Sequence, residues 1–279
     1  MDTKKKINVT IFGASGKIGL SLAKKYLKNN DRINLFYRNN KNKTYLINKL
    51  DFDKYKNNIN LIKLSTYNEK VFSNHIKKNK KIFNKTDLLI LTVGEQGEIS
   101  NFFGCNLNKF KQTFFVNFMI YVIFFKNIYS LLNKKKKLLI ILFSGGGSTS
   151  YRRNFSSYSL SKICLVKLTE IISNEIKNKK IRFNILSPGI IDSKMTRKII
   201  NEKNKVSKNE ILKIKKNIKN SEINITKIFK TINFLNSKKG RLISGKLISS
   251  AWDKISNLDS EKLNKLVNTD IFTLRRKEL

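Results

Sequence analysis

The sequence is poor in the residues that build metal centres and disulfide frameworks. It contains one histidine, His75, one proline, and two cysteines, Cys105 and Cys164, among 279 residues. The cysteines lie far apart in apolar surroundings, which favours two buried thiols in a reducing compartment over a redox pair. A single histidine in a polar Lys/Asn stretch nearly excludes a histidine-based catalytic pair. We therefore predict no metal site.

Acidic residues are also scarce, at 19 against 58 Lys and Arg, and the formal net charge is +39. Such a charge suggests a nucleic-acid partner. However, the excess is mostly lysine and is spread along the whole chain together with Asn and Ile. Proteins that recognise base sequence usually concentrate Arg and aromatic residues on one element, and no such element is present. We expect no specific nucleic-acid binding.

Long apolar runs and linkers are absent. The most apolar stretch, Phe114–Phe125, has about a dozen residues, whereas a membrane-spanning helix needs roughly 20. It predicts a buried helix or one in an oligomer interface, and no membrane span. The N-terminus has no apolar leader segment, which favours a cytoplasmic location. Without a Gly/Ser-rich linker, the chain is predicted to form a single domain over residues 1–279.

Short apolar or β-branched runs alternate with longer amphipathic runs along the chain. This alternation is typical of an α/β fold in which helices cover both faces of a doubly wound parallel sheet. The polar, mostly helical segment at about 192–237 is predicted to form a lid, and residues 253–279 a C-terminal tail. Strands are predicted at Asn8–Phe12, Ile33–Tyr37, Ile59–Leu64, Asp87–Val93, Leu138–Phe143, Ile181–Leu186 and Leu242–Ser249, and helices at Ile18–Lys28, Phe110–Leu132 and Tyr158–Asn178.

A glycine-rich turn, GASGKIG at Gly13–Gly19, links the first predicted strand to the first helix. Its backbone N–H groups and the helix N-terminus suit a pyrophosphate, although a tight turn without a ligand is the alternative. The second strand ends in Phe-Tyr-Arg-Asn, without the acid that would bind an adenosine ribose. Arg38 there suits a 2′-phosphate, and Lys17 adds charge. The pattern favours NADP(H) over NAD(H), unless Arg38 is an ordinary surface cation.

A tyrosine and a lysine four residues apart, Tyr158 and Lys162, begin a predicted helix and share one face. A fixed cation favours the phenolate and so suits a tyrosine for general acid–base catalysis. Ser144 follows a parallel strand, where its hydroxyl can donate to a substrate carbonyl oxygen. Asn117 is a lone amide in an apolar run. It either holds a water in a proton relay or is a satisfied core residue at a helix kink.

In their order, the motifs GASGKIG, LTVG (Leu91–Gly94), Asn117, Ser144, YSLSK and SPG resemble the short-chain dehydrogenase/reductase family, in its compact single-domain branch, over roughly Lys6–Trp252. The resemblance implies a Rossmann-type fold and a homodimer or homotetramer formed through the helix with the asparagine. It implies that Tyr158 transfers a proton, Ser144 steadies the substrate oxygen, Lys162 binds the nicotinamide ribose and lowers the tyrosine pKa, and Asn117 completes a water-linked relay. The implied cofactor contacts are Gly13, Ser15, Ile18, Gly19, Gly94, Lys162, Pro188 and Gly189, with Ser193 able to reach the carboxamide.

The chain departs from this family pattern at the adenine end of the site. Lys17 stands where the compact branch usually has glycine, and Gly16 lies one position earlier. The usual Asn-Asn-Ala-Gly is LTVG, and Ser193 replaces a threonine. These changes leave the four expected catalytic positions intact.

Two arginines, Arg152 and Arg153, lie between Ser144 and Tyr158. They suggest an acidic or phosphorylated small-molecule substrate, unless they are ordinary solvated cations. The first hypothesis for function is hydride transfer between NADP(H) and a carbonyl/alcohol pair. A sugar-nucleotide epimerase or dehydratase is an alternative that the short chain disfavours. A non-catalytic dinucleotide sensor is a third, disfavoured because the tyrosine and lysine are retained.

Overall fold

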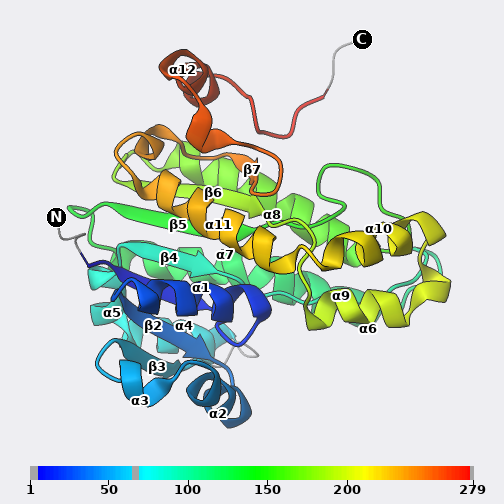
Figure 1. Cartoon of the computed structure of the whole chain (residues 1–279), viewed down its shortest axis with the longest axis horizontal. Coiled ribbons are helices and arrows are strands. Elements are labelled where there is room, and N and C mark those ends of the chain that lie inside the picture. The colour runs from blue at the N-terminus through cyan, green and yellow to red at the C-terminus, as the bar shows by residue number, and fades with distance from the viewer. Residues whose placement is uncertain (1–5, 65–68, 277–279) are drawn as a thin grey trace.

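A parallel β-sheet runs through the centre of the molecule (Figure 1). The computed structural model describes residues 6–64 and 69–276, and in this part of the chain the sheet has seven strands in the order β3-β2-β1-β4-β5-β6-β7. Every neighbouring pair of these strands is parallel, which confirms the predicted fold class. The strands are β1 (Asn8–Phe12), β2 (Arg32–Tyr37), β3 (Ile59–Lys63), β4 (Leu88–Leu91), β5 (Leu138–Phe143), β6 (Ile181–Ser187) and β7 (Leu247–Ser249).

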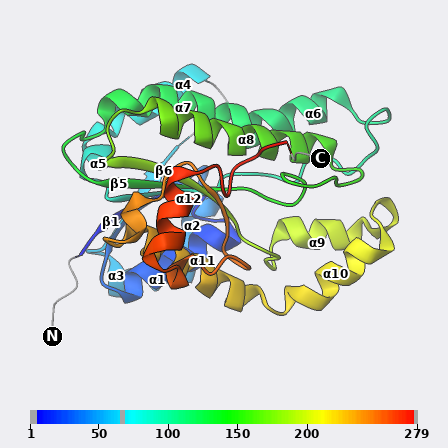
Figure 2. The ribbon, with the colours of Figure 1, turned by 90° about the horizontal axis from the view of Figure 1, so that it is seen from above.

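Helices cover both faces of the sheet (Figure 2). Helices α1 and α11 contact each other on one face, while α4, α7 and α8 lie on the other. The helices are α1 (Lys17–Lys28), α2 (Asn40–Lys49), α3 (Phe52–Tyr55), α4 (Glu69–Lys78), α5 (Lys80–Lys85), α6 (Leu107–Phe114), α7 (Ile120–Ile128), α8 (Ser156–Glu175), α9 (Lys194–Asn201), α10 (Lys208–Ile218), α11 (Ser221–Asn236) and α12 (Ser260–Asn268).

The central strands are apolar at successive positions because both of their faces are covered. All residues of β4 and β5 are buried. On the α4/α7 face, aromatic rings fill the interface between sheet and helices. Phe12 stacks on Phe36 with 4.2 Å between ring centroids, and Phe124 meets Phe12 edge-on at 4.8 Å. The chain builds the sheet outward in one direction from β1 to β3 and in the other direction from β4 to β7. A parallel sheet forms a binding crevice at such a reversal, here between β1 and β4.

The segment at about 192–237, predicted to form a lid, does not lie in one place in the structure. Helix α11 belongs to the layer that covers the sheet, because Ile225, Ile228, Ile232 and Leu235 are fully buried in the core next to α1. Residues 194–218, which form α9 and α10, project from the body at one end of the molecule (Figure 1). The predicted last strand, Leu242–Ser249, is also shorter, since its first residue ends a 3₁₀ turn at Gly240–Leu242.

The predicted helix at Phe110–Leu132 is a nearly continuous helical stretch interrupted by a π-helical turn at Phe115–Met119. By length and composition, Leu107–Leu131 is apolar enough to cross a membrane, and 39% of its most apolar window is buried. Core helices of soluble proteins meet the same criterion. In this structure Tyr121, Phe124 and Ile128 are buried in the core, and α7 packs against α4.

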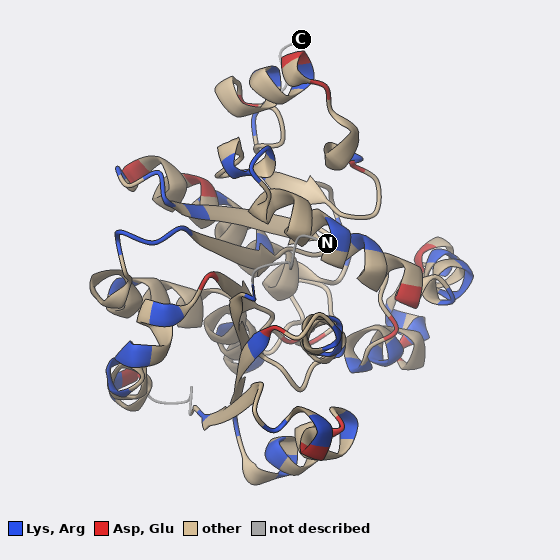
Figure 3. Cartoon of the chain, turned by 60° about the vertical axis from the view of Figure 1, so that its left-hand side comes forward, with Lys and Arg blue, Asp and Glu red and all other residues tan. Residues whose placement is uncertain are grey.

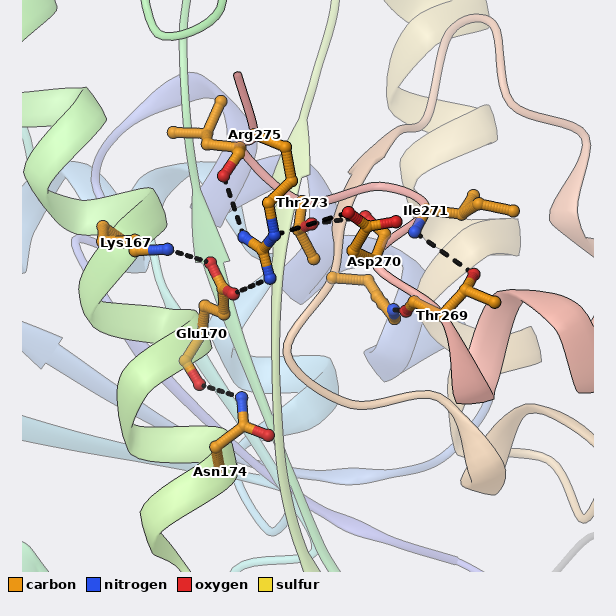
Figure 4. Close-up of polar contacts among 10 residues, drawn as sticks. Lys167, Glu170, Asn174, Thr269, Asp270, Ile271, Thr273 and Arg275 are labelled. Atoms are coloured by element: carbon orange, nitrogen blue, oxygen red, sulfur yellow. Dashed lines mark hydrogen bonds and ion pairs between the residues drawn. The ribbon is translucent and has the colours of Figure 1, made fainter. Parts of the chain in front are cut away.

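The C-terminal tail lies along the edge of the sheet. The Leu247 backbone N–H donates to Phe272 O at 2.8 Å, so the tail covers part of the exposed edge of β7. Figure 4 shows how Arg275 reaches Glu170 of α8, at 2.6 Å, while Lys167 pairs with the same carboxylate at 2.9 Å. The tail is also packed against the body, because Ile255, Leu263 and Leu266 are buried in the same core cluster as α1 and α11.

Lysine and arginine occur on many helices and loops in the view of Figure 3 rather than on one element. The central strands carry little charge in the same view. The high net charge of +39 is thus spread over many elements rather than confined to one.

Candidate active site

A cleft of about 2270 Å³ opens at the carboxyl ends of the central strands. Pockets for drug-sized ligands usually measure about 300–1,000 Å³, so this cleft has room for a dinucleotide and a substrate. It brings together nearly all the residues expected from the sequence, and Asn117 lies behind its wall. The expected residues that line it are Gly13, Ser15, Lys17, Ile18, Gly19, Arg38, Gly94, Ser144, Tyr158, Lys162, Pro188, Gly189 and Ser193.

The glycine-rich turn is tightly packed against the segment that follows β4. Gly13 has a φ of +76°, and a Cβ there would lie 2.7 Å from Thr92 Oγ1. A Cβ on Gly19 would lie 2.6 Å from Gly13 O. Both positions therefore require glycine. Sequence reasoning missed Thr92, whose Oγ1 lies 2.7 Å from Phe12 O and 3.0 Å from Gly13 O and thus braces the turn.

Helix α1 presents an open N-terminus to this turn. Its N-cap is Gly16, no side chain caps it, and its first turn contains no acid. The first amides of a helix have no intrahelical partner, and together with the helix dipole they favour an anion. The space beside the glycines and the free amides of α1 together fit the pyrophosphate of a dinucleotide.

The adenine end of the cleft is only partly as expected. Arg38 lines the cleft directly after β2, and Phe36–Tyr45 contains no acid. Lys17 also lines the cleft, but its ammonium forms an ion pair of 2.6 Å with Glu222 of α11. The Ser193 hydroxyl is occupied too, because it accepts the Thr196 backbone N–H at 3.3 Å and caps α9.

Tyr158 and Lys162 lie together in the first turns of α8, where both are buried at 7% and 4% exposure. Lys162 Nζ is 5.8 Å from the centroid of the Tyr158 ring and donates to Phe143 O at 3.1 Å. Burial lowers the pKa of Lys162 to about 8. Burial also raises the pKa of Tyr158, and the positive charge of Arg152 opposes this rise.

The Gly145-Gly146-Gly147 segment after β5 makes room for the tyrosine. A Cβ on Gly145 would lie 2.1 Å from the Tyr158 hydroxyl oxygen, so any larger residue would displace the phenol. Ser144 precedes this segment and is buried, with its Oγ donating to Ser148 Oγ at 2.7 Å. Ser148 was not expected from the sequence. Its hydroxyl orients the Ser144 hydroxyl within the cleft wall.

Asn117 occupies the π-helical turn and is fully buried. Its Oδ1 accepts the Glu95 backbone N–H at 2.8 Å, and its Nδ2 donates to Glu95 O at 2.9 Å and to Ser161 Oγ at 3.1 Å. The side chain therefore fastens the loop after β4 to α8. Its satisfied hydrogen bonds at an interruption of the helix agree with the core-residue alternative, and its part in a water relay stays a prediction.

The two arginines between Ser144 and Tyr158 are placed differently. Arg152 lines the cleft, but its Nε and Nη2 both donate to Glu210 Oε1 of α10, at 2.8 and 2.6 Å. Arg153 is exposed and lies outside the lining of the cleft. An acidic substrate would therefore have to compete with Glu210 for Arg152, which weakens the inference drawn from this pair of residues.

The fold and this cleft define a Rossmann-type α/β protein with a buried tyrosine–lysine pair in the cleft at the carboxyl ends of its strands. A family model described as short chain dehydrogenase matches residues 7–204. The chain belongs to this family, and its members are oxidoreductases. A comparison with curated proteins finds no match.

Solved structures share the fold at low sequence identity. One is a short chain dehydrogenase from Shigella flexneri 2a str. 301 complexed with NADP, with a TM-score of 0.73, 14% identity, and coverage of 90% of this chain and 99% of that chain. Levodione reductase has a TM-score of 0.72 at 15% identity, over 88% of this chain and 98% of its own. ElxO with NADP bound has a TM-score of 0.71 at 22% identity, over 88% and 97%. At these identities the likeness is one of fold.

Proposed function

We propose that the protein transfers a hydride between NADP(H) and a small-molecule carbonyl/alcohol pair, with Tyr158 as the general acid and base. The observation that carries this proposal is the buried pair of Tyr158 and Lys162 on the cleft wall, 5.8 Å from ring centroid to ammonium. Ser144 lines the same cleft. The family and its fold support this assignment.

In the direction of carbonyl reduction, the Tyr158 hydroxyl donates its proton to the substrate oxygen. The Ser144 hydroxyl turns from Ser148 and donates a hydrogen bond to the same oxygen as negative charge develops there. The Lys162 ammonium favours the phenolate that remains after proton transfer. The nicotinamide cofactor, when bound, supplies or accepts the hydride. In alcohol oxidation the same residues act in reverse, and the phenolate accepts the proton.

The cofactor preference rests on the cation after β2. Arg38 lines the cleft, and the segment around it lacks the acid that selects NAD. A guanidinium forms bidentate hydrogen bonds with a phosphate, so Arg38 favours a 2′-phosphate. The glycine turn and the N-terminus of α1 would hold the pyrophosphate, and Pro188 and Gly189 would border the nicotinamide.

The test measures binding of NADPH and NADH by fluorescence, followed by a screen of carbonyl substrates. We expect tighter binding of NADPH, with Arg38→Met losing about tenfold or more of this preference. Arg32→Met, an exposed arginine at the opposite end of β2, is the matched control and should retain it. Tyr158→Phe should bind NADPH normally and lose turnover. Failure of the protein to bind either dinucleotide would refute the proposal.

The same experiment separates the alternatives. Cofactor that stays bound, with no net turnover of added NADPH, would favour an epimerase or dehydratase. Dinucleotide binding that is unaffected by any substrate would favour a sensor. Equal turnover in Tyr158→Phe would refute only the role of the tyrosine.

We also propose a homodimer or homotetramer in the cytoplasm. Apolar side chains on the outer face of the α6/α7 and α8 helices support an interface between copies. These are Leu107, Met119, Leu160 and Ile171, with exposed fractions of 61%, 37%, 43% and 43%. Leu160→Lys should convert the assembly to monomers in size-exclusion chromatography, and an unchanged elution volume would contradict this interface.

A further inference from the structure

The projecting α9–α10 segment is fastened across the cleft by polar contacts to two loops of the body. Lys198 of α9 donates to Gly97 O at 2.6 Å, and Asn154 Nδ2 donates to Lys205 O at 2.7 Å. The third contact is the pair of hydrogen bonds from Arg152 to Glu210 of α10. Beneath them lies a small apolar cluster that includes Ile99, Phe155, Ile199, Val206, Ile211 and Ile214. These contacts tie the segment to the two loops on the other side of the cleft in this structure.

Of the residues that make these contacts, Arg152 also lies near Tyr158, the proposed proton donor. Its guanidinium carbon lies 3.6 Å from the centroid of the Phe155 ring and 5.9 Å from that of Tyr158. The side chain is 13% exposed. The glycine segment leaves the space that it occupies, since a Cβ on Gly146 would lie 3.7 Å from the guanidinium and one on Gly147 3.2 Å from Arg152 Cβ.

We propose that Arg152, held in place by Glu210 of α10, is a positioning residue that couples closure of the α9–α10 segment to proton transfer at Tyr158. This proposal rests on the proposed function. When the segment is closed, the planar guanidinium is clamped between the carboxylate and the Phe155 ring, and its charge stays at a fixed distance from the phenol. When the segment opens, Arg152 loses both hydrogen bonds and is free to leave the tyrosine.

Among the charged and titratable groups around Tyr158, Arg152 has an electrostatic role that the others do not share. Lys162 faces the ring from α8, Arg152 faces it from the loop after β5, and Tyr121 of α7 interacts with it electrostatically. Glu210 faces Arg152 rather than the phenol. Because the pKa of Lys162 is lowered to about 8, its charge declines at mildly alkaline pH, whereas a guanidinium remains charged. Arg152 therefore supplies the permanent positive charge.

The test compares Arg152→Met, Arg152→Lys and Glu210→Gln, with the exposed Arg153→Met as the matched control. The first readout is the ionisation of Tyr158 in the protein without ligands, monitored by phenolate absorbance. Each variant is compared with the same variant carrying Tyr158→Phe, and the difference between the two titrations reports Tyr158 alone. The second readout is the pH profile of alcohol oxidation with NADP+, using the alcohol of the best carbonyl found in the screen. Circular dichroism checks that each variant is folded.

We expect Arg152→Met to move the midpoint of Tyr158 ionisation, and of the rise in oxidation rate, upward by roughly half to one pH unit. Arg152→Lys should keep the midpoint because it keeps the charge, yet raise KM severalfold because it loses the two-donor fork to Glu210. Glu210→Gln should raise KM in the same way and move the midpoint down or leave it unchanged. Arg153→Met should change neither quantity.

An Arg152→Met midpoint equal to that of wild type would overturn the electrostatic role. An unchanged KM in Glu210→Gln would overturn the coupling to α10. Because phenolate titration needs neither substrate nor cofactor, it tests Arg152 even if no turnover is found. Loss of the proposed function would appear separately, as absence of dinucleotide binding or as full turnover in Tyr158→Phe.

Discussion

Replacement of Lys162 by methionine should stabilise the fold at neutral pH. The side chain is 4% exposed, and burial lowers its pKa from 10.5 to about 8. At about 1.4 kcal/mol for each pH unit, keeping this ammonium charged in the folded state at pH 7 costs about 3 kcal/mol. Methionine removes that cost but also the hydrogen bond to Phe143 O, which contributes about 1.5 kcal/mol because its donor is charged. The expected net gain is about 1.5 kcal/mol in the free energy of unfolding.

The gain should depend on pH with a definite sign. Between pH 8 and 10.5 the unfolded chain binds the Lys162 proton and the folded chain does not. The contribution of this lysine to wild-type stability therefore rises with pH across that interval. The penalty is fully present below pH 8 and vanishes above 10.5, so the methionine variant loses its advantage as the pH rises through this range.

Urea unfolding followed by circular dichroism at pH 7, 8, 9 and 10 measures this difference. Lys24→Met, an exposed position on α1, is the matched control and should change stability by less than about 0.5 kcal/mol at each pH. The reasoning is refuted if Lys162→Met is less stable than wild type at pH 7, or if the difference between them does not change with pH.

Three further substitutions test the site and the tail. Gly13→Ala should lower stability by about 1–3 kcal/mol and weaken NADPH binding, because its φ of +76° and the nearby threonine exclude a Cβ; unchanged stability and binding would contradict the proposed pyrophosphate site. Asn117→Ala should lower the free energy of unfolding in urea by about 2–4 kcal/mol, because the partly buried backbone N–H and C=O of Glu95 lose their partner. A loss below about 1 kcal/mol would contradict this. Glu170→Gln should lower the free energy of unfolding by less than about 1 kcal/mol, and this loss should shrink at high salt, because Arg275 is 42% exposed. A larger loss would show that this ion pair anchors the fold.

The sequence predicted the sheet well because its strands are buried on both faces. Strands β1 and β5 agree with the prediction to the residue. Strand β5 is an uninterrupted apolar run between Lys137 and Ser144, and β1 ends where the glycine-rich turn begins. Helix α11 shows where such reasoning failed. Its apolar residues Ile225, Ile228, Ile232 and Leu235 recur at helical spacing, but the surrounding lysines and asparagines of this basic chain made the whole segment look like an exposed lid.

The parts of the site that local patterns could not predict are the long-range contacts. Arg152 and Glu210 are 58 positions apart, and Lys17 and Glu222 are 205 positions apart, so only the fold brings them together. Thr92 was classed as a departure from a family motif. Its contact with the Gly13 turn depends on β1 and β4 lying side by side, which a motif comparison does not evaluate.

The distribution of acids reconciles the high charge of the chain with a selective cleft. Among the described residues, five acids line the cleft, namely Glu95, Glu98, Asp192, Glu202 and Glu210. The last four form ion pairs with Lys109, Arg197, Lys205 and Arg152, which lowers the positive potential at the substrate end. Without these pairs, the net charge of +39 would favour binding of anions in the cleft more strongly. We therefore expect that substrates are selected by fit beneath α9 and α10 rather than by charge, and that Glu210→Gln increases inhibition by inorganic phosphate; equal inhibition of the variant and wild type would show that the pairing does not control access.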